Sequence, residues 1–345
     1  MDQRVVLAVA GSGKTSYIVD SIDEAKRALI ITYTENNYRN LRDRIVGRFG
    51  FIPENTRIYT YFSFLYSFCL RPLCGDLYGF RGINWEMPPM STRRFKQNDL
   101  RHYRDQNGRI YASRIASFMI NFLLVDDIRQ RISKYFDYLY VDEVQDFAGY
   151  DFDLLLDVLS NNINTCLVGD FFQHTYDTSR DGAKNRNLHN DFTYYCTELE
   201  KRGLAVDNTT LSNSYRCSPT TCNFVTEKLG ININSHQDDE TVLEFVDDEG
   251  WAEAIFDMSH VVKLFYQSHQ TYPCYSNNWG ASKGVDDYDA VCVVLNKKSE
   301  ILFRKGQLSS LPSTTRNKLY VACTRARSQL YFVPERFLSK FKLPN

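Results

Sequence analysis

Residues 4–15 have the sequence RVVLAVAGSGKT. After Arg4 the run is apolar and contains three valines, so it predicts a buried strand over residues 4–9. Gly11 and Gly13 then permit a tight turn whose N–H groups face phosphate, and the helix that follows would present its positive end. We expect Lys14 to neutralise the β and γ phosphates and the Thr15 hydroxyl to hold Mg²⁺. The stretch therefore predicts an α/β fold with a nucleotide-binding loop.

The loop departs from the full phosphate-loop pattern at one position. The pattern places a glycine five residues before Gly13, and this chain has Ala8 there. A glycine-rich turn without nucleotide is the alternative reading. The order of strand, GKT and two later strand ends favours the nucleotide site.

Two further strand-like runs end in polar side chains. Residues 138–141 lead into Asp142 and Glu143, and residues 165–168 lead to Gln173. Ligands of open parallel sheets lie at the carboxyl ends of the strands, so Asp142 is placed to meet Mg²⁺ and Glu143 to orient and deprotonate water. An acidic cluster after a strand more often begins a solvated helix, but the phosphate loop reverses that preference.

Composition limits the classes of protein that remain. The 345 residues, 43% hydrophobic and 14% aromatic, suffice for two α/β domains. A net charge of −1 excludes a strongly basic nucleic-acid binder, so any such site is local. Residues 91–114 are rich in arginine with interleaved aromatics, and they form either that site or a solvated helical face.

Cysteine and histidine usage predicts neither disulfides nor a metal cluster. The nine cysteines and six histidines are scattered, and Cys217 and Cys222 lack zinc-site spacing. We expect buried, reduced thiols. The chain opens without a signal core and contains no apolar run of membrane-spanning length, which predicts a cytoplasmic protein without a membrane partner.

Taken in order along the chain, these segments resemble the motifs of the UvrD/Rep/PcrA-like superfamily 1 DNA helicases, in a compact form with reduced accessory domains. The order of the motifs is the specific part of the resemblance. The matching segments are residues 8–15, 32–37, 60–64, 142–146, 169–176, 211–216, 281–289 and 319–327.

The resemblance implies two RecA-like P-loop domains with parallel sheets. The first covers residues 1–205 and carries a helical insertion at about 67–131. The second covers residues 206–345 with a short insertion at about 220–275. ATP is expected between these lobes, and single-stranded DNA, or a duplex with a single-stranded tail, is expected to cross them.

The resemblance also implies roles for single residues. Tyr215 would stack on adenine, and Arg325 would act as an arginine finger, whose guanidinium stabilises charge on the transferred phosphoryl group. The expected catalytic residues are Lys14, Glu143, Gln173, Arg216 and Arg325. The expected nucleotide and Mg²⁺ residues are Gly11, Ser12, Gly13, Lys14, Thr15, Ser16, Asp142, Tyr215, Arg216 and, for the ribose, Asp286 or Asp287. The expected nucleic-acid contacts are Tyr33, Thr34, Asn36, Thr60, Phe62, Tyr176, Ser282 and Lys283.

Three departures qualify the resemblance. Phe62 stands where the family has histidine, and Thr178 stands where it has a base-stacking tryptophan. The phosphate loop begins only a few residues from Met1, so a preceding helix that recognises adenine is not expected. The second insertion carries acidic runs, which read as a solvated surface or a protein-binding face.

The sequence therefore predicts an ATP-dependent DNA translocase or helicase moving 3′ to 5′. The alternative is a regulatory, DNA-sensing ATPase subunit of a nuclease or phage-defence complex that does not unwind. A P-loop kinase is disfavoured because it has no use for the later motifs.

Overall fold

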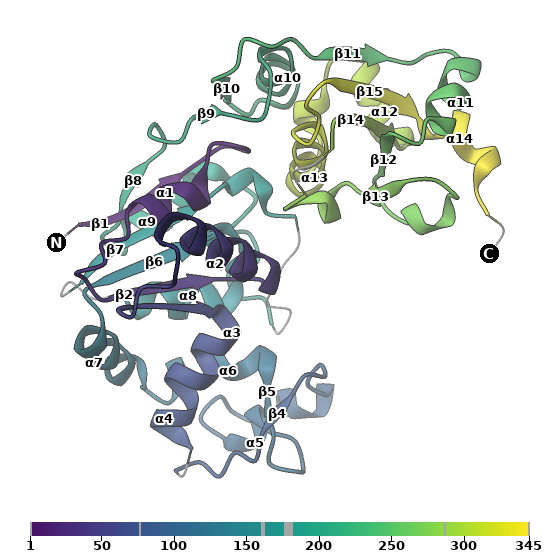
Figure 1. Cartoon of the computed structure of the whole chain (residues 1–345). Helices are drawn as coiled ribbons and strands as arrows, with labels where there is room; N and C mark the ends of the chain where they lie inside the picture. Colours follow the sequence, from purple (N-terminus) through teal and green to yellow (C-terminus); the bar gives the residue numbers. More distant parts are fainter. Residues whose placement is uncertain (1, 76, 160–162, 176–181, 286–287, 344–345) are drawn as a thin grey trace. The chain divides into compact units, whose positions relative to one another are not determined.

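A computed structural model describes residues 2–75, 77–159, 163–175, 182–285 and 288–343, and the chain forms two compact units (Figure 1). Unit 1 comprises Met1–Val6, Thr15–Gly169 and Asp177–Asp207. Unit 2 comprises Leu7–Lys14, Asp170–Tyr176 and Asn208–Asn345. The phosphate loop and the segment after Gly169 thus pack with the carboxyl-terminal residues.

Unit 1 is built on a six-stranded sheet with the order β3-β2-β6-β7-β1-β8. The β2–β3, β2–β6, β6–β7 and β1–β8 pairings are parallel. Every residue of β2 is buried, as expected for a strand covered on both faces. The strands are β1 (Gln3–Leu7), β2 (Ala28–Thr32), β3 (Thr56–Thr60), β6 (Tyr138–Asp142), β7 (Asn164–Gly169) and β8 (Ala205–Asp207).

Helix α2 (Glu35–Phe49) of unit 1 is capped at both ends. The Thr34 hydroxyl accepts a hydrogen bond from the Asn37 amide, and Gly50 ends the helix at a φ of 81°. Leu41 and Ile45 form its buried face. Apart from α3 (Tyr61–Ser63) and the helices of the insertion, the unit also has α1 (Lys14–Asp20), α7 (Val125–Tyr135), α8 (Gly149–Asp157) and α9 (Phe192–Glu200).

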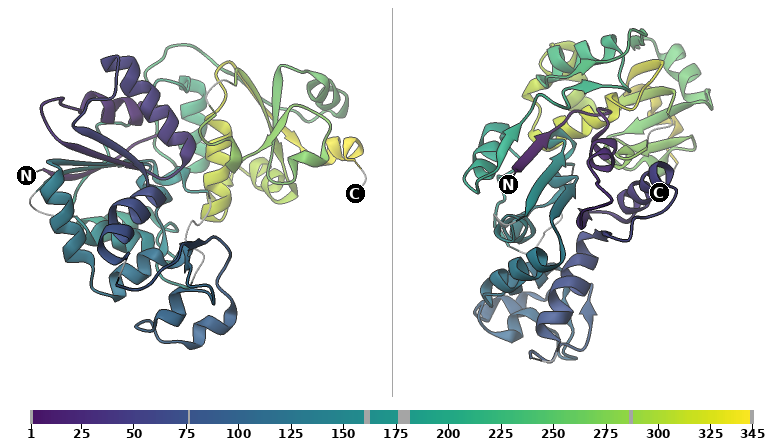
Figure 2. Two further views of the ribbon diagram at one scale, coloured as in Figure 1. Left: turned by 60° about the horizontal axis from the view of Figure 1, so that its bottom comes forward. Right: turned by 60° about the vertical axis from the view of Figure 1, so that its left-hand side comes forward.

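The insertion of unit 1 follows α3 (Tyr61–Ser63) and projects from the sheet, as both figures show (Figures 1 and 2). Helix lies mainly at its two ends, and residues 91–114 contain only short helical turns. The solvated helical face, one of the two alternatives for 91–114, fits in part. Most cations of the stretch are exposed, but it forms only short turns, and Arg114 is fully buried and bonds Thr92 and the His102 carbonyl. The elements are η1 (Phe64–Leu70), α4 (Arg71–Cys74), β4 (Ile83–Asn84), η2 (Met90–Arg94), α5 (Leu100–Tyr103), β5 (Ile110–Tyr111), η3 (Ala112–Arg114) and α6 (Ile115–Asn121).

Unit 2 is built on a parallel five-stranded sheet with the order β11-β15-β14-β12-β13. Alternate residues of β14 enter two separate cores: Val291, Val293 and Leu295 lie in one, and Ala290, Cys292 and Val294 in the other. Both faces of the sheet are therefore covered. The strands are β11 (Val242–Phe245), β12 (Val261–Phe265), β13 (Ser276–Asn278), β14 (Ala290–Leu295) and β15 (Gln329–Pro334).

The first of these cores also takes in Val9 and Ala10 of the phosphate loop. The helices around the sheet are α10 (Pro219–Phe224), α11 (Glu249–Asp257), α12 (Lys297–Arg304), α13 (Ser313–Cys323) and α14 (Glu335–Leu338). A further strand pair joins β9 (Asn213–Ser214) and β10 (Asn234–Ser235). The mixed α/β class with parallel sheets of RecA-like type is confirmed.

One predicted strand boundary is corrected by the structure. Strand β1 ends at Leu7 rather than at Val9, because the Val9 amide donates to the Leu211 carbonyl instead of to the sheet. All nine cysteines are free, and seven are buried. Among the residues that the structure describes, none of the helices combines the length and apolar character that a membrane crossing requires.

Candidate functional site

The phosphate loop is held by backbone hydrogen bonds to residues 211–216. The Val9 amide donates to the Leu211 carbonyl at 3.0 Å, and the Tyr215 amide donates to the Gly11 carbonyl at 2.9 Å. Gly11 has a φ of 72°, and a Cβ there would lie 2.7 Å from the side chains of Ser214 and Arg216. Glycine is required at this position by both its backbone and its neighbours.

Tyr215 offers a flat surface beside the loop. Its ring is 61% exposed and stacks on His236, with centroids 4.1 Å apart and planes 13° from parallel. The ring edge also comes within 4.0 Å of the position that a Cβ on Gly13 would take. An exposed tyrosine rigidified by a stacked neighbour, next to a phosphate loop, suits a nucleobase. The sequence did not predict a role for His236.

Tyr320 links three predicted motifs through one hydroxyl group. It lies in α13, and its side chain is fully buried. The hydroxyl accepts a hydrogen bond from the Ala10 amide of the phosphate loop at 2.8 Å and donates one to Asp170 Oδ2 at 3.0 Å. Burial, with the Asp170 charge second, raises the pKa of Tyr320 well above its ordinary value, so the hydroxyl stays protonated. The sequence placed Tyr320 in a motif but gave it no role.

The segment with Gln173 docks on the same helix. Asn317 of α13 donates to the His174 carbonyl at 3.1 Å, and Asp170 caps the turn η5 (Phe171–Gln173) by accepting from the Phe172 amide. Gln173 is buried, at 4% exposure. Unit 2 therefore brings the phosphate loop, Gln173, Tyr215 and α13 together as one packed group.

The two predicted carboxylates stand at the end of β6 in unit 1. Asp142 is the last residue of the strand and is 2% exposed. Glu143 adopts left-handed backbone angles, with a φ of 56° and a ψ of 46°, which a non-glycine residue rarely takes. Its carboxylate accepts a hydrogen bond from Gln145. Strained residues held by their neighbours are typical of catalytic positions.

The two predicted arginines have different settings. Arg216 follows Tyr215 beside Gly11. Arg325 lies just beyond the end of α13, is 2% exposed, and donates to the carbonyls of Val285 at 2.9 Å and Val321 at 3.2 Å. These bonds fix its guanidinium to the unit 2 framework.

Several predicted nucleic-acid contacts also have structural tasks. Thr34 caps α2, and Thr60 caps α3 through a bond from the Ser63 amide. Ser282 is fully buried and donates to the Trp279 carbonyl at 2.7 Å. Asn36 is exposed in the first turn of α2, and Lys283 is half-buried after Ser282. Tyr176, Asp286 and Asp287 lie outside the described residues.

Aromatic side chains gather where the other predicted contacts lie. Tyr33 stacks on Tyr61, with ring centroids 5.8 Å apart. The ring centroids of Phe62 and Trp85 lie 4.3 Å apart, and Trp85 is 69% exposed. The sequence did not single out Trp85, although a tryptophan in the polar stretch 81–86 is a usable signal. It adds an exposed stacking surface of the kind that Thr178 does not provide.

The donor set fits a nucleoside triphosphate and Mg²⁺. A positive φ at Gly11 and Gly13 is the curled backbone that a phosphate cradle needs. The side chains of Lys14 and Thr15 make no hydrogen bond or ion pair with any residue that the structure describes, which leaves an ammonium and a hydroxyl for phosphate and metal. Ser16 accepts a bond from Arg44 at 3.0 Å. No group of three or more His, Cys, Asp or Glu residues able to hold a metal occurs in the described ranges.

Comparison with solved structures gives only distant likenesses. A helicase structure of PRRSV matches with a TM-score of 0.49 and 14% identity over 99% of this chain and 54% of that chain. The arterivirus nonstructural protein 10 helicase in a complex with DNA matches with a TM-score of 0.49 and 14% identity over 96% of this chain and 60% of that one. The chain thus spans less than two thirds of the length of these structures. No curated protein matches the sequence.

The model of the viral superfamily 1 RNA helicase core domain matches residues 120–334, well over half of the chain. The matched range contains the carboxylates of β6, the Gln173 segment, Tyr215 and Arg325. The match supports superfamily 1 and does not single out the UvrD/Rep/PcrA-like group. The chain belongs to the family of viral superfamily 1 RNA helicase core domains.

Proposed function

We propose that this chain is an ATP-hydrolysing motor that moves along single-stranded DNA in the 3′ to 5′ direction, as the UvrD-like resemblance implies. The observation that carries the proposal is the attachment of the phosphate loop to the later motifs. The Tyr215 amide bonds Gly11, and the Tyr320 hydroxyl bonds Ala10. A small-molecule kinase has no need of such attachments, whereas a motor must make its nucleotide loop respond to other segments.

Each predicted residue then has a chemical task. Lys14 and the loop amides would hold the phosphates, and Thr15 and Asp142 would hold Mg²⁺, which when bound neutralises phosphate charge. Glu143 would orient a water molecule and accept its proton. Gln173, Arg216 and Arg325 would act on the γ-phosphate, and Tyr215 would stack on the base.

An ATPase assay with and without single-stranded DNA tests the proposal. Glu143→Gln should abolish hydrolysis and keep ATP binding, whereas Lys14→Ala should remove binding itself. Arg325→Ala should lower stimulated turnover by about 10³-fold or more while ATP still binds. Loss of ATP binding in Arg325→Ala would mean that this arginine is structural, and tight ATP binding by Lys14→Ala would overturn the loop assignment.

Strand displacement on duplexes with 3′ or 5′ tails decides the polarity and the kind of motor. Displacement from 3′-tailed DNA supports the proposal. Stimulation without displacement supports the regulatory ATPase subunit instead. Parallel reactions on RNA are needed because the matching family is described as an RNA helicase core, and stimulation by RNA alone would replace DNA as the track.

A substitution of Trp85 tests nucleic-acid binding separately from ATP hydrolysis. Base stacking on an exposed aromatic is worth about 1–3 kcal/mol, so Trp85→Ala should weaken single-strand binding roughly tenfold and leave DNA-free hydrolysis unchanged. Fluorescence anisotropy of a labelled oligonucleotide measures the change. Phe51→Ala removes another exposed aromatic, at 54% exposure, and serves as the control. Equal affinities of the two variants for the oligonucleotide would show that Trp85 does not contact the single strand.

A further inference from the structure

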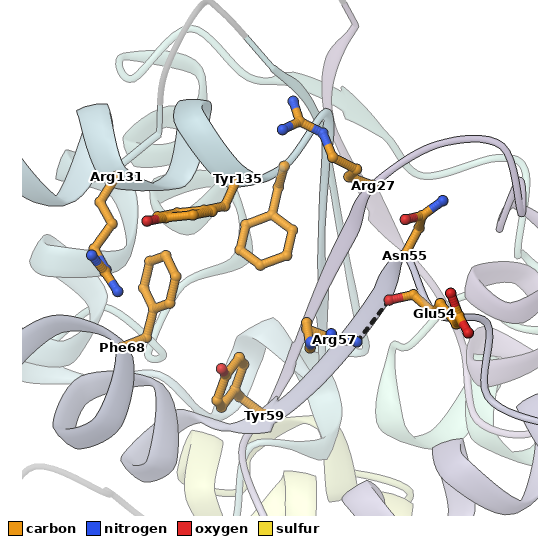
Figure 3. Close-up of a pocket in the computed structure, with 9 residues that line it drawn as sticks. Arg27, Glu54, Asn55, Arg57, Tyr59, Phe68, Arg131 and Tyr135 are labelled. Carbon is orange, nitrogen blue, oxygen red and sulfur yellow. Dashed lines mark hydrogen bonds between the residues drawn. The ribbon is translucent and has the colours of Figure 1, made fainter.

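A cavity lies in unit 1, away from the predicted nucleotide residues. Its volume is about 310 Å³, and it runs along the edge strand β3 from the amino ends of β2 and β3 (Figure 3). Predicted nucleotide residues of the sheet, such as Asp142, lie at the opposite, carboxyl end of the parallel strands. The cavity is therefore a separate feature of the fold.

Aromatic rings form most of its wall. Phe68 is the centre of the group: its ring centroid lies 6.2 Å from that of Tyr59, 6.5 Å from that of Tyr135 and 5.8 Å from that of Phe136. Figure 3 shows Tyr135 and Phe68 facing the space from opposite elements, with Tyr59 coming from β3. Phe68 and Phe136 are buried, whereas Tyr135 is 43% exposed. Such a wall accepts a flat ring.

Guanidinium groups supply the charge of the cavity. Arg131 lies over the rings of Phe68 and Tyr135, at 4.9 and 5.1 Å from their centroids. Its Nε is buried and finds no hydrogen-bond acceptor among the residues that the structure describes. Arg57 donates only to the backbone carbonyls of Glu54 and Thr56.

Neither Arg57 nor Arg131 has a carboxylate partner within the described ranges, whereas Arg27 does. Arg27 is neutralised by two bonds to the Asp137 carboxylate, one of 2.7 Å and one of 3.1 Å. A side chain carboxylate at the rim comes from Glu54, and the net charge of the lining is positive. A buried donor without an acceptor costs free energy, which an anionic ligand would recover.

From this combination we propose that the cavity binds one nucleoside phosphate, either free or at the end of a nucleic-acid strand. The aromatic wall would stack on the base, and Arg57 and Arg131 would bind the phosphate. Aromatic cages also bind quaternary ammonium groups, but two unpaired guanidinium groups would repel a cation. A volume near the lower end of the roughly 300–1,000 Å³ range of ligand sites suits a single nucleotide.

Calorimetric titration of the full chain tests the proposal, with Lys14→Ala present throughout to silence the phosphate loop. Uridine and adenosine monophosphates should bind, and inorganic phosphate should bind at least tenfold more weakly. Arg131→Gln and Arg57→Gln should each weaken the monophosphates at least tenfold. Arg129→Gln is the matched control on the same helix, because Arg129 bonds the Asp157 carbonyl and Asp126 instead. Melting temperatures identify any variant that fails to fold, and the second variant then decides.

Titrations with short oligonucleotides identify the source of the ligand. Tighter binding of a 5′-phosphorylated tetranucleotide than of its unphosphorylated form would show that the ligand is a strand end. Equal binding of the free monophosphate and the tetranucleotide would show that it is a free nucleotide. No binding of monophosphate at millimolar concentration, or binding of an acidic aromatic peptide in its place, would overturn the proposal. The readout does not involve hydrolysis, so it stands or fails independently of the proposed motor activity.

Discussion

At the scale of single residues, the phosphate loop depends on the absence of one side chain. Gly11 combines a left-handed backbone with neighbours too close for a Cβ, whereas Gly203 has a similar φ of 84° and open space around it. The two positions therefore separate backbone strain from steric conflict.

Gly203→Ala should lower the free energy of unfolding by only about 1–2 kcal/mol, the cost of a left-handed non-glycine residue. Gly11→Ala should cost more and also abolish ATP binding, because the added carbon displaces residues 214–216. Denaturant unfolding and nucleotide titration measure both effects. Retained ATP affinity in Gly11→Ala would contradict this account of the loop.

Tyr320 gives a second residue-scale prediction. Tyr320→Phe leaves the Ala10 amide and Asp170 without the shared hydroxyl, so unfolding free energy should fall by about 1–3 kcal/mol and the KM for ATP should rise more than kcat falls. Tyr331→Phe is the control, since among the described residues the hydroxyl it removes bonds only Gln329. A change in kcat alone would mean that Tyr320 does not position the loop.

At the scale of elements, a half-buried carboxylic acid connects α8 with α3. The Tyr61 hydroxyl lies 3.3 Å from Asp151 Oδ1 and 3.4 Å from the Asp151 carbonyl, beneath the stacked ring of Tyr33. Burial raises the pKa of Asp151 from its ordinary value of 3.8 to about 7. The uncharged form of this acid is therefore favoured over a wider pH range than usual, beside a predicted nucleic-acid contact.

The raised pKa predicts how stability depends on pH. Between about pH 4 and pH 7 the folded chain keeps a proton at Asp151 that the unfolded chain has released, so this group lowers stability as pH rises through that window. Asp151→Asn should remove that fall and be relatively most stabilising above pH 7. Unfolding free energies at pH 5 and pH 8 test it, with exposed Asp127→Asn as the control. An unchanged pH slope would place the Asp151 pKa near its ordinary value.

At the scale of the whole molecule, charge is balanced in sum but not locally. The net charge is −1, whereas the basic stretch 91–114 holds seven arginines and lysines against two aspartates. Arg101 pairs with Asp99 at 2.6 Å, and Arg109 pairs with Asp105 at 2.7 Å. The stretch therefore keeps a net positive charge, whereas the whole chain does not.

Because the whole chain carries no excess positive charge, single-strand binding should depend only moderately on salt unless this stretch binds the phosphate backbone. With three or four phosphates contacted, the slope of log affinity against log salt should be about −2 to −3. Anisotropy titrations between 50 and 200 mM salt measure it. A slope steeper than about −6 would show that the basic stretch grips the backbone after all.

The sequence predicted three strands of the unit 1 sheet because buried parallel strands are apolar runs, visible locally. Strand β7 covers the predicted residues 165–168, and β6 ends at Asp142 where the predicted run meets its carboxylates. The short turns of 91–114 and the burial of Arg114, which bonds Thr92 and the His102 carbonyl, depend on contacts that composition does not reveal.

The sequence by itself determined the chemistry available to this protein: a glycine-lysine-threonine loop, carboxylates at strand ends and an ordered set of motifs. Only the tertiary structure decided which groups meet. The Tyr320 hydroxyl bonds an amide 310 residues away, and the cavity along β3 joins an edge strand to α7. Hydrogen bonds and ring contacts act over a few ångströms, so partners distant in the chain become known only when the sheets bring them together.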